Sequence, residues 1–291
     1  MKISSRGLSV SAALLLSAIG MSAAARADDL QVPFLNFNAP ASTPQWIVTV
    51  GGMGGIQPSY PGAKGYAFYG LPTLEFRRED QPPRFSSPDD DFSFVVLHND
   101  WFAVGPAGNW VNNRSVRNNL ALYGMNSVDA SIELGAFAEW TPLSFLRVRA
   151  EARKAVSGYD GWAFNLGGDV WQKWGPVTLS VGPRLNFNND QYANAFFSVS
   201  PIQALVNQSI GGVLTPYNAS GGLTSAGLTA AARYEVNEQW RVSVFGNYQV
   251  LTGSIANSPL VLRDGSRDQF TTGLEIAYHY RTGALSFLPT F

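Results

Sequence analysis

The stretch that decides the fold is "FLRVRAEARKAV", residues 145–156. Its content of Ala, Arg and Glu is typical of a helix, but ionised side chains occupy every second position, at Arg147, Arg149, Glu151 and Arg153. On a helix this spacing would scatter the charges around the axis, whereas on a strand it places them all on one face. The stretch therefore predicts a β-strand with one charged face and one apolar face.

The same alternation recurs along the chain, in residues 131–140, 177–187, 226–235, 240–250 and 270–280. Each run has about ten residues, the length of a tilted strand that crosses the outer membrane. Several apolar faces end in an aromatic residue, such as Trp140 and Trp240, as in the aromatic girdles of outer-membrane barrels. In a bilayer every backbone N–H and C=O must be paired, so such a sheet has to close on itself.

We therefore predict an all-β protein, a closed antiparallel transmembrane β-barrel with a polar lumen. A soluble β-sandwich or a water-soluble barrel also alternates, with the charged faces outward, and alternation alone does not distinguish these folds. The expected strands are residues 46–56, 66–78, 92–97, 101–111, 128–140, 145–156, 162–171, 177–187, 226–235, 240–251 and 269–280. Because bacterial barrels usually have an even strand number, residues 195–200 are the candidate for a twelfth, and we expect about 12 strands (about 10–14). The longer connections at 79–91, 112–127, 201–222 and 252–267 are expected to be loops or plugs.

The first residues have the features of a cleaved signal peptide. Lys2 and Arg6 precede an apolar run, residues 8–19, which is too short to span a bilayer comfortably. The sequence "AAARADD" then predicts cleavage between Ala27 and Asp28. The expected organisation is a signal peptide at 1–27, a periplasmic N-terminal extension at 28–45 and an outer-membrane barrel at 46–291, in the outer membrane of a Gram-negative cell.

Composition narrows the function. The chain has no cysteine, which excludes disulfides, thiolate catalysis and cysteine metal sites. Only 14% of the residues are charged, against about 25% in soluble domains. The formal net charge is −1 and becomes −4 when the signal peptide is removed, which argues against nucleic acid as a partner. No later stretch approaches the 18 apolar residues of a transmembrane helix.

The polar faces of the predicted strands carry charges of both signs. The lumen-lining candidates are Glu133, Glu139, Arg147, Arg149, Glu151, Arg153, Arg184, Arg233, Glu235, Arg241 and Glu275. One interpretation is an electrostatic lining that selects solutes. The other, which we favour, is a network of Arg–carboxylate pairs that fills and stiffens a barrel of intermediate width.

Nothing in the sequence indicates catalysis or a cofactor. The two histidines, His98 and His279, have no serine motif beside them, so we predict a non-enzymatic protein without cofactor or metal. The acidic stretch "PDDD" at 88–91 lacks the spacing and the glycine of a Ca²⁺ loop, and we interpret it as a solvated turn.

Four stretches taken in order carry a family resemblance. They are "YPGAKGYAFYGLPTLEFR" (60–77), "SGYDGWAFNLGGDV" (157–170), "GPRLNFNNDQYANAFFSVSP" (182–201), and "NSPLV" (257–261) followed by "QFTTGLEIAY" (269–278). Together they resemble the MipA/OmpV family of Gram-negative outer-membrane proteins over most of the chain after the signal peptide.

The resemblance implies an outer-membrane barrel with a structural or scaffolding role. One family member is described as joining a murein lytic transglycosylase to a penicillin-binding synthase, so periplasmic murein enzymes are the expected partners, besides outer-membrane lipid. The alternatives are a small passive channel for polar solutes and a surface adhesin. One departure concerns the C-terminus, where Pro289 beside the terminal Phe291 does not fit the regular aromatic-ended last strand of such barrels.

Overall fold

The computed structural model describes residues 46–79, 83–116 and 119–282. Its strands are β1 (Trp46–Pro58), β2 (Tyr66–Arg78), β3 (Phe92–Ser93), β4 (Leu97–His98), β5 (Phe102–Val111), β6 (Ser131–Leu143), β7 (Leu146–Ala155), β8 (Trp162–Trp174), β9 (Val177–Asn188), β10 (Gly222–Glu235), β11 (Trp240–Leu251) and β12 (Asp268–Thr282). Its helices are α1 (Asp190–Phe197), α2 (Pro201–Ser209) and α3 (Pro259–Leu262), with the 3-10 turns η2 (Leu120–Leu122) and η3 (Ile255–Asn257). The predicted signal peptide, the N-terminal extension and the C-terminal aromatic lie outside these residues.

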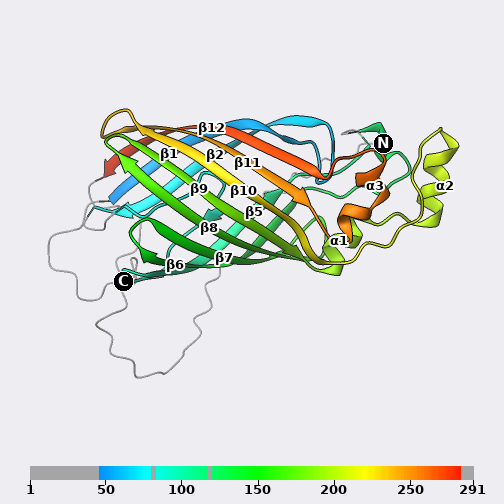
Figure 1. Cartoon of the computed structure of the whole chain (residues 1–291), viewed down its shortest axis with the longest axis horizontal. Helices are drawn as coiled ribbons and strands as arrows, with labels where there is room; N and C mark the ends of the chain where they lie inside the picture. The colour runs from blue at the N-terminus through cyan, green and yellow to red at the C-terminus, as the bar shows by residue number, and fades with distance from the viewer. Residues whose placement is uncertain (1–45, 80–82, 117–118, 283–291) are drawn as a thin grey trace, which may run out of the picture.

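One antiparallel ladder joins the strands into a long curled sheet (Figure 1). The order is β2-β1-β12-β11-β10-β9-β8-β7-β6-β5-β3, and β4 also pairs with β5. The prediction of about twelve antiparallel strands is confirmed, but the choice of residues 195–200 as the twelfth is wrong. That segment contains the end of α1, whose N-cap Asn189 accepts from the backbone N–H of Tyr192. The count of twelve arises because the strand predicted at 92–97 is divided into the two short strands β3 and β4.

The charged faces point inward and the apolar faces outward. On β7, Arg147 and Arg153 are 1% and 3% exposed, whereas Leu134 on the outer face of β6 and Val181 on the outer face of β9 are 54% and 50% exposed. A soluble protein would bury these apolar side chains. The apolar exterior fits the hydrocarbon of a bilayer, so the membrane interpretation of the alternation holds against the soluble one.

The two ends of the sheet differ. At one end, short turns at 144–145, 175–176 and 236–239 connect the strands. At the other, long connections carry the helices α1, α2 and α3, which gather there as a cap (Figure 1). Two apolar clusters hold the cap together, one around Phe196 and Phe197 of α1 and the other around Leu122 and Leu260.

The two end strands of the ladder run in the same direction, because every pairing between them is antiparallel. The rings of Phe76 on β2 and Phe94 just after β3 meet edge to face at 6.5 Å, so the curled sheet brings its ends together. A backbone ladder that closes the barrel stays a prediction. Parallel neighbours need a return crossing of the chain, and here residues 83–91 make that crossing through the interior.

Candidate functional site

The charged residues of the lumen gather around this inner segment. The three consecutive aspartates at 89–91 each pair with a different arginine of the wall: Asp89 with Arg184, Asp90 with Arg147 and Asp91 with Arg153. The arginines come from β7 and β9, so one short segment is bound to two separate strands. The segment is therefore anchored across the lumen as a plug; we call residues 83–91 the inner plug.

Arg147 is the centre of the network and is almost fully buried. Its Nη1 and Nη2 donate to the two carboxylate oxygens of Asp90 at 2.6 and 2.9 Å. Its Nε donates to Asp169 at 3.0 Å, and Nη1 also reaches Glu139 at 3.3 Å. A guanidinium offers five N–H donors in a planar fork, and this geometry lets one cation serve three carboxylates.

Arg149 and Arg153 continue the network along the same face of β7. Glu151 lies between them and accepts from both, from Arg149 Nε at 2.6 Å and from Arg153 Nη1. Arg153 also donates to Glu133 at 3.1 Å and pairs with Asp91 at 2.6 Å. The alternation of residues along one strand and its register with β6 thus place opposite charges side by side.

Arg184 on β9 holds the other end of the aspartate run. It donates from Nε and Nη2 to the two oxygens of Asp89, both at 2.9 Å, and from Nη2 to Asp169 at 2.8 Å. It also reaches the hydroxyl of Ser87 at 3.1 Å. Asp169 therefore joins Arg184 to Arg147, and the two halves of the network form one connected unit.

A second cluster lies nearer the short-turn end. Arg241 donates to Glu75 at 2.9 Å and to Glu275 at 3.3 Å, and Ser243 donates to Glu275 at 3.0 Å. Arg233 donates to the carbonyl of Ser86 at 2.9 Å, so this cluster also holds the inner plug.

The structure brings all eleven predicted lumen residues to the inner face of the sheet. Most are buried, and Arg184, Arg233 and Glu235 are partly buried. Whether they line a conducting lumen stays a prediction. Among the described residues the arginines of this set are engaged with carboxylates, hydroxyls or carbonyls, and Glu133, Glu139, Glu151 and Glu275 with arginines, as in the pairing interpretation.

Sequence reasoning missed several partners. Residues 88–91 do form a turn, in which Asp90 N–H donates to the Ser87 carbonyl, but its predicted exposure to solvent is wrong, because the three aspartates are side-chain partners of buried arginines and only 13–25% exposed. Asp169 and Glu75 lie on the inner faces of β8 and β2, and their alternation with neighbouring residues could have revealed them. No local signal marks the aspartates, since their partners lie far along the chain.

A cavity of about 1990 Å³ occupies the interior between the inner plug and the short-turn end. Arg147, Arg149 and the inner plug line its deep part. Lys173, Glu238 and Arg281 line its mouth. Within the described residues the interior is therefore a vestibule between the short-turn end and the inner plug, which blocks it further in.

One wall of the vestibule holds a hydroxyl, an imidazole and a carboxylate in line. Thr49 Oγ1 lies 2.7 Å from His279 Nδ1, and His279 Nε2 lies 3.8 Å from Glu235 Oε2. The second distance is too long for a hydrogen bond, and the Thr49 side chain is buried, so the orienting contact of a catalytic triad is missing.

Within the described ranges no group of His, Asp or Glu is arranged to hold a metal ion, and no helix is long and apolar enough to cross a membrane.

Comparisons with known proteins agree with this architecture. The family model described as "MltA-interacting protein MipA" matches residues 50–280. The outer membrane protein Omp26La of Vibrio anguillarum is 27% identical over 106 residues, a match that covers 36% of this chain and 37% of that protein.

Among solved structures, an outer membrane channel from Pseudomonas putida F1 has a TM-score of 0.40 at 9% identity, covering 83% of this chain and 99% of that one. OmpT of Vibrio cholerae has a TM-score of 0.33 at 9% identity, covering 84% and 99%. These scores are low, and the fold assignment rests on the strand ladder described above.

Proposed function

The chain belongs to the MipA family, and from this premise we propose that it is an occluded outer-membrane barrel that presents a docking site to murein enzymes in the periplasm. An outer-membrane β-barrel protein of this family has its apolar exterior in lipid. Short turns face the periplasm in barrels of this kind, so the vestibule opens towards the periplasm.

The observation that carries the proposal is the inner plug. Each of the three aspartates at 89–91 meets a wall arginine, and Arg147 is engaged by three carboxylates at once. A lumen filled in this way obstructs solute passage and instead gives the barrel a stiff interior. What remains accessible is the charged rim of the vestibule, with Glu238 and Arg281 exposed.

The family name gives the class of partner, since it describes a protein that interacts with MltA, which we take as a murein lytic transglycosylase by the resemblance noted above. The proposed role is non-enzymatic. The Thr49–His279–Glu235 group supports this, because its second contact is 3.8 Å long.

The test uses the absence of native cysteine. A photo-crosslinker attached at Glu238→Cys, on the rim, is expected to capture a purified murein lytic transglycosylase when the mature chain is refolded in detergent. The matched control carries the crosslinker at Leu205→Cys, an exposed position on α2 at the opposite end. Equal capture at both positions, or capture at neither, would overturn the docking proposal.

A passive channel is the second candidate, because ion pairs and hydrogen bonds attach the described part of the inner plug to the barrel wall, and such contacts can be broken. We expect the refolded wild-type chain to insert into a planar bilayer and conduct little. Replacing Asp89, Asp90 and Asp91 together with Asn should release the inner plug and raise conductance. Stable openings of the wild-type chain would favour the channel over the occluded barrel.

A further inference from the structure

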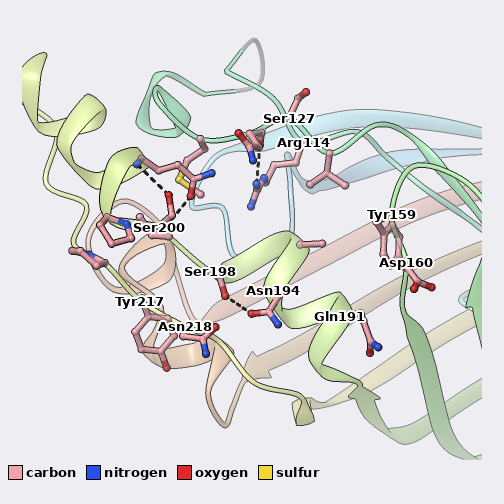
Figure 2. Close-up of a pocket in the computed structure, with 18 of the residues that line it drawn as sticks. Arg114, Ser127, Tyr159, Asp160, Gln191, Asn194, Ser198, Ser200, Tyr217 and Asn218 are labelled. Carbon is pink, nitrogen blue, oxygen red and sulfur yellow. Dashed lines mark hydrogen bonds between the residues drawn. The ribbon is translucent and has the colours of Figure 1, made fainter.

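A second cavity, of about 940 Å³, lies in the cap at the other end of the sheet (Figure 2). Its walls come from α1, the start of α2, and the connections around residues 125–128, 158–160 and 216–218. None of its lining residues belongs to the inner plug, and only Tyr159, whose hydroxyl donates to Glu133, touches the Arg–carboxylate network. The cavity is therefore a separate site that the scaffolding proposal does not use.

The walls of this cavity are already held in place by bonds within the protein. Val199 and Tyr217 exchange two backbone hydrogen bonds of 2.8 Å, and Arg114 and Val128 do the same at 2.8 Å. Ser200 begins α2 with a capping box, in which its hydroxyl accepts from the N–H of Gln203 and its own N–H donates to the Gln203 side chain. A ligand would therefore meet preformed walls, which lowers the entropic cost of binding.

The lining is rich in neutral hydrogen-bonding groups. Only Arg114 and Asp160 carry charge, and the polar remainder consists of amides, hydroxyls and two tyrosines: Asn126, Ser127, Tyr159, Gln191, Asn194, Ser198, Ser200, Gln203, Tyr217 and Asn218. Figure 2 shows several of these side chains around the hollow, with Tyr217 and Asn218 side by side on one wall and Tyr159 and Asp160 across from them. Such a set can both donate to and accept from many hydroxyl groups of one ligand.

Much of this hydrogen-bonding capacity is unused. Among the described residues no side-chain partner is recorded for Asn126, Ser127 or Asn218, which are exposed at the cavity wall. Asn194 Oδ1 accepts from Ser198, which leaves the amide N–H₂ of Asn194 available. Arg114 adds little to this capacity, because its Nη atoms donate to backbone carbonyls and its Nε is buried away from the cavity surface.

The charges exclude other ligand classes. An anion such as phosphate would find one guanidinium, whose two Nη groups are already held by the carbonyls of Phe196 and Asn126. A cation would find Asp160, which pairs with Lys154 at 3.5 Å. An apolar ligand would leave the amides unpaired at a cost. The remaining class is a neutral molecule with many hydroxyls and some apolar C–H surface to pack on the tyrosine rings.

We propose that this cavity binds a neutral saccharide of a few sugar units. The long connections of outer-membrane barrels face the cell exterior, where sugars are available either as free glycans or as the saccharide part of lipopolysaccharide. Amide and hydroxyl side chains would hold the sugar hydroxyls, and Tyr217 and Tyr159 would contact the C–H faces.

The test measures binding by saturation-transfer NMR and calorimetry on the mature chain refolded in detergent. The probes are maltotriose, chitotriose and a neutral oligosaccharide fragment released from the outer polysaccharide of lipopolysaccharide. We expect at least one probe to bind with a Kd of about 1 mM or tighter. The double variant Asn126→Ala/Asn218→Ala should weaken that binding about tenfold, the effect of losing one or two neutral hydrogen bonds. Ser127→Trp should also weaken binding, because the indole would block part of the cavity wall.

The matched control is Asn113→Ala, an exposed asparagine in the same connection that does not line the cavity. It should leave binding unchanged, and heat-dependent gel mobility should show that every variant is folded. Binding of the trisaccharides would indicate free glycans, and binding of the neutral lipopolysaccharide fragment alone would indicate lipopolysaccharide. If none of the three probes binds below about 10 mM, or if Asn113→Ala weakens binding as much as the double variant, the proposal is wrong.

Discussion

The interior of the barrel and the cap are packed by opposite means. Inside the barrel, buried arginines and carboxylates hold the strands and the inner plug together. In the cap, apolar side chains such as Phe196, Phe197 and Leu260 form the core, and the only buried cation of the described cap, Arg114, has no carboxylate partner. The difference follows from where the apolar residues are needed. In the barrel the apolar side chains face lipid, so the interior relies on charge pairing. The cap has water outside, so its apolar side chains are buried in its core.

Arg147→Met should have the largest effect on the barrel. The substitution removes a positive charge that compensates the buried carboxylates of Asp90, Asp169 and Glu139. Removing one partner of a buried ion pair lowers stability by about 3–5 kcal/mol. The measurement is urea-induced unfolding of the refolded chain in detergent or lipid. Lys154→Met on the same strand is the control, since its side chain is 49% exposed and pairs only with Asp160 at the surface. If both variants lose equal stability, the network does not hold the barrel.

Phe196→Ala should weaken the cap and leave the barrel intact. Phe196 is 1% exposed and packs against Tyr159 and Tyr192, and removal of a buried Phe costs about 3–5 kcal/mol. Because the apolar clusters lie in the cap, we expect faster cleavage by a protease in the long connections with unchanged heat-dependent gel mobility. Leu120→Ala, at an exposed position of the cap, should leave the cleavage rate unchanged. Loss of the folded gel band in Phe196→Ala would contradict independent packing of the two regions.

Which parts the sequence could predict depends on the range of the interactions. The two-residue period of residues 145–156 reports a local backbone geometry, so the strand and its charged face were predictable. The aspartates of the inner plug were not, because Asp90 and Arg147 lie 57 residues apart and meet only once the sheet has curled. The prediction of a strand at residues 195–200 was wrong for a related reason. Their Phe and Val favour a strand, but burial in the cap and the Asn189 cap place residues 195–197 in a helix, and Val199 forms only an isolated bridge with Tyr217.

Ala150→Arg tests which face of β7 meets lipid. Ala150 lies on the exposed face between Arg149 and Glu151, and an arginine there would enter the hydrocarbon at a cost of about 2–4 kcal/mol. The expected result is a lower yield of refolded barrel in lipid vesicles, with a smaller loss in detergent micelles, which adapt to the added charge. Ala150→Leu is the control and should refold like the wild type. An unchanged yield for Ala150→Arg in vesicles would place this face in water.

Arg114→Met should have the smallest effect, although Arg114 is as deeply buried as Arg147. Burial without a carboxylate partner lowers the pKa of Arg114 to about 10, with the Tyr60 hydroxyl offsetting part of the shift. A base whose pKa falls on folding is destabilising while charged, so Arg114 costs stability at all pH values below about 10, and that cost is relieved only above it. Methionine removes this destabilisation but also loses the hydrogen bonds to the carbonyls of Phe196 and Asn126. Because the two effects oppose each other, the net loss of cap stability should be only about 1 kcal/mol at neutral pH. Protease sensitivity of the cap measures it, and a loss as large as that of Phe196→Ala would mean that charge holds the cap as it holds the barrel.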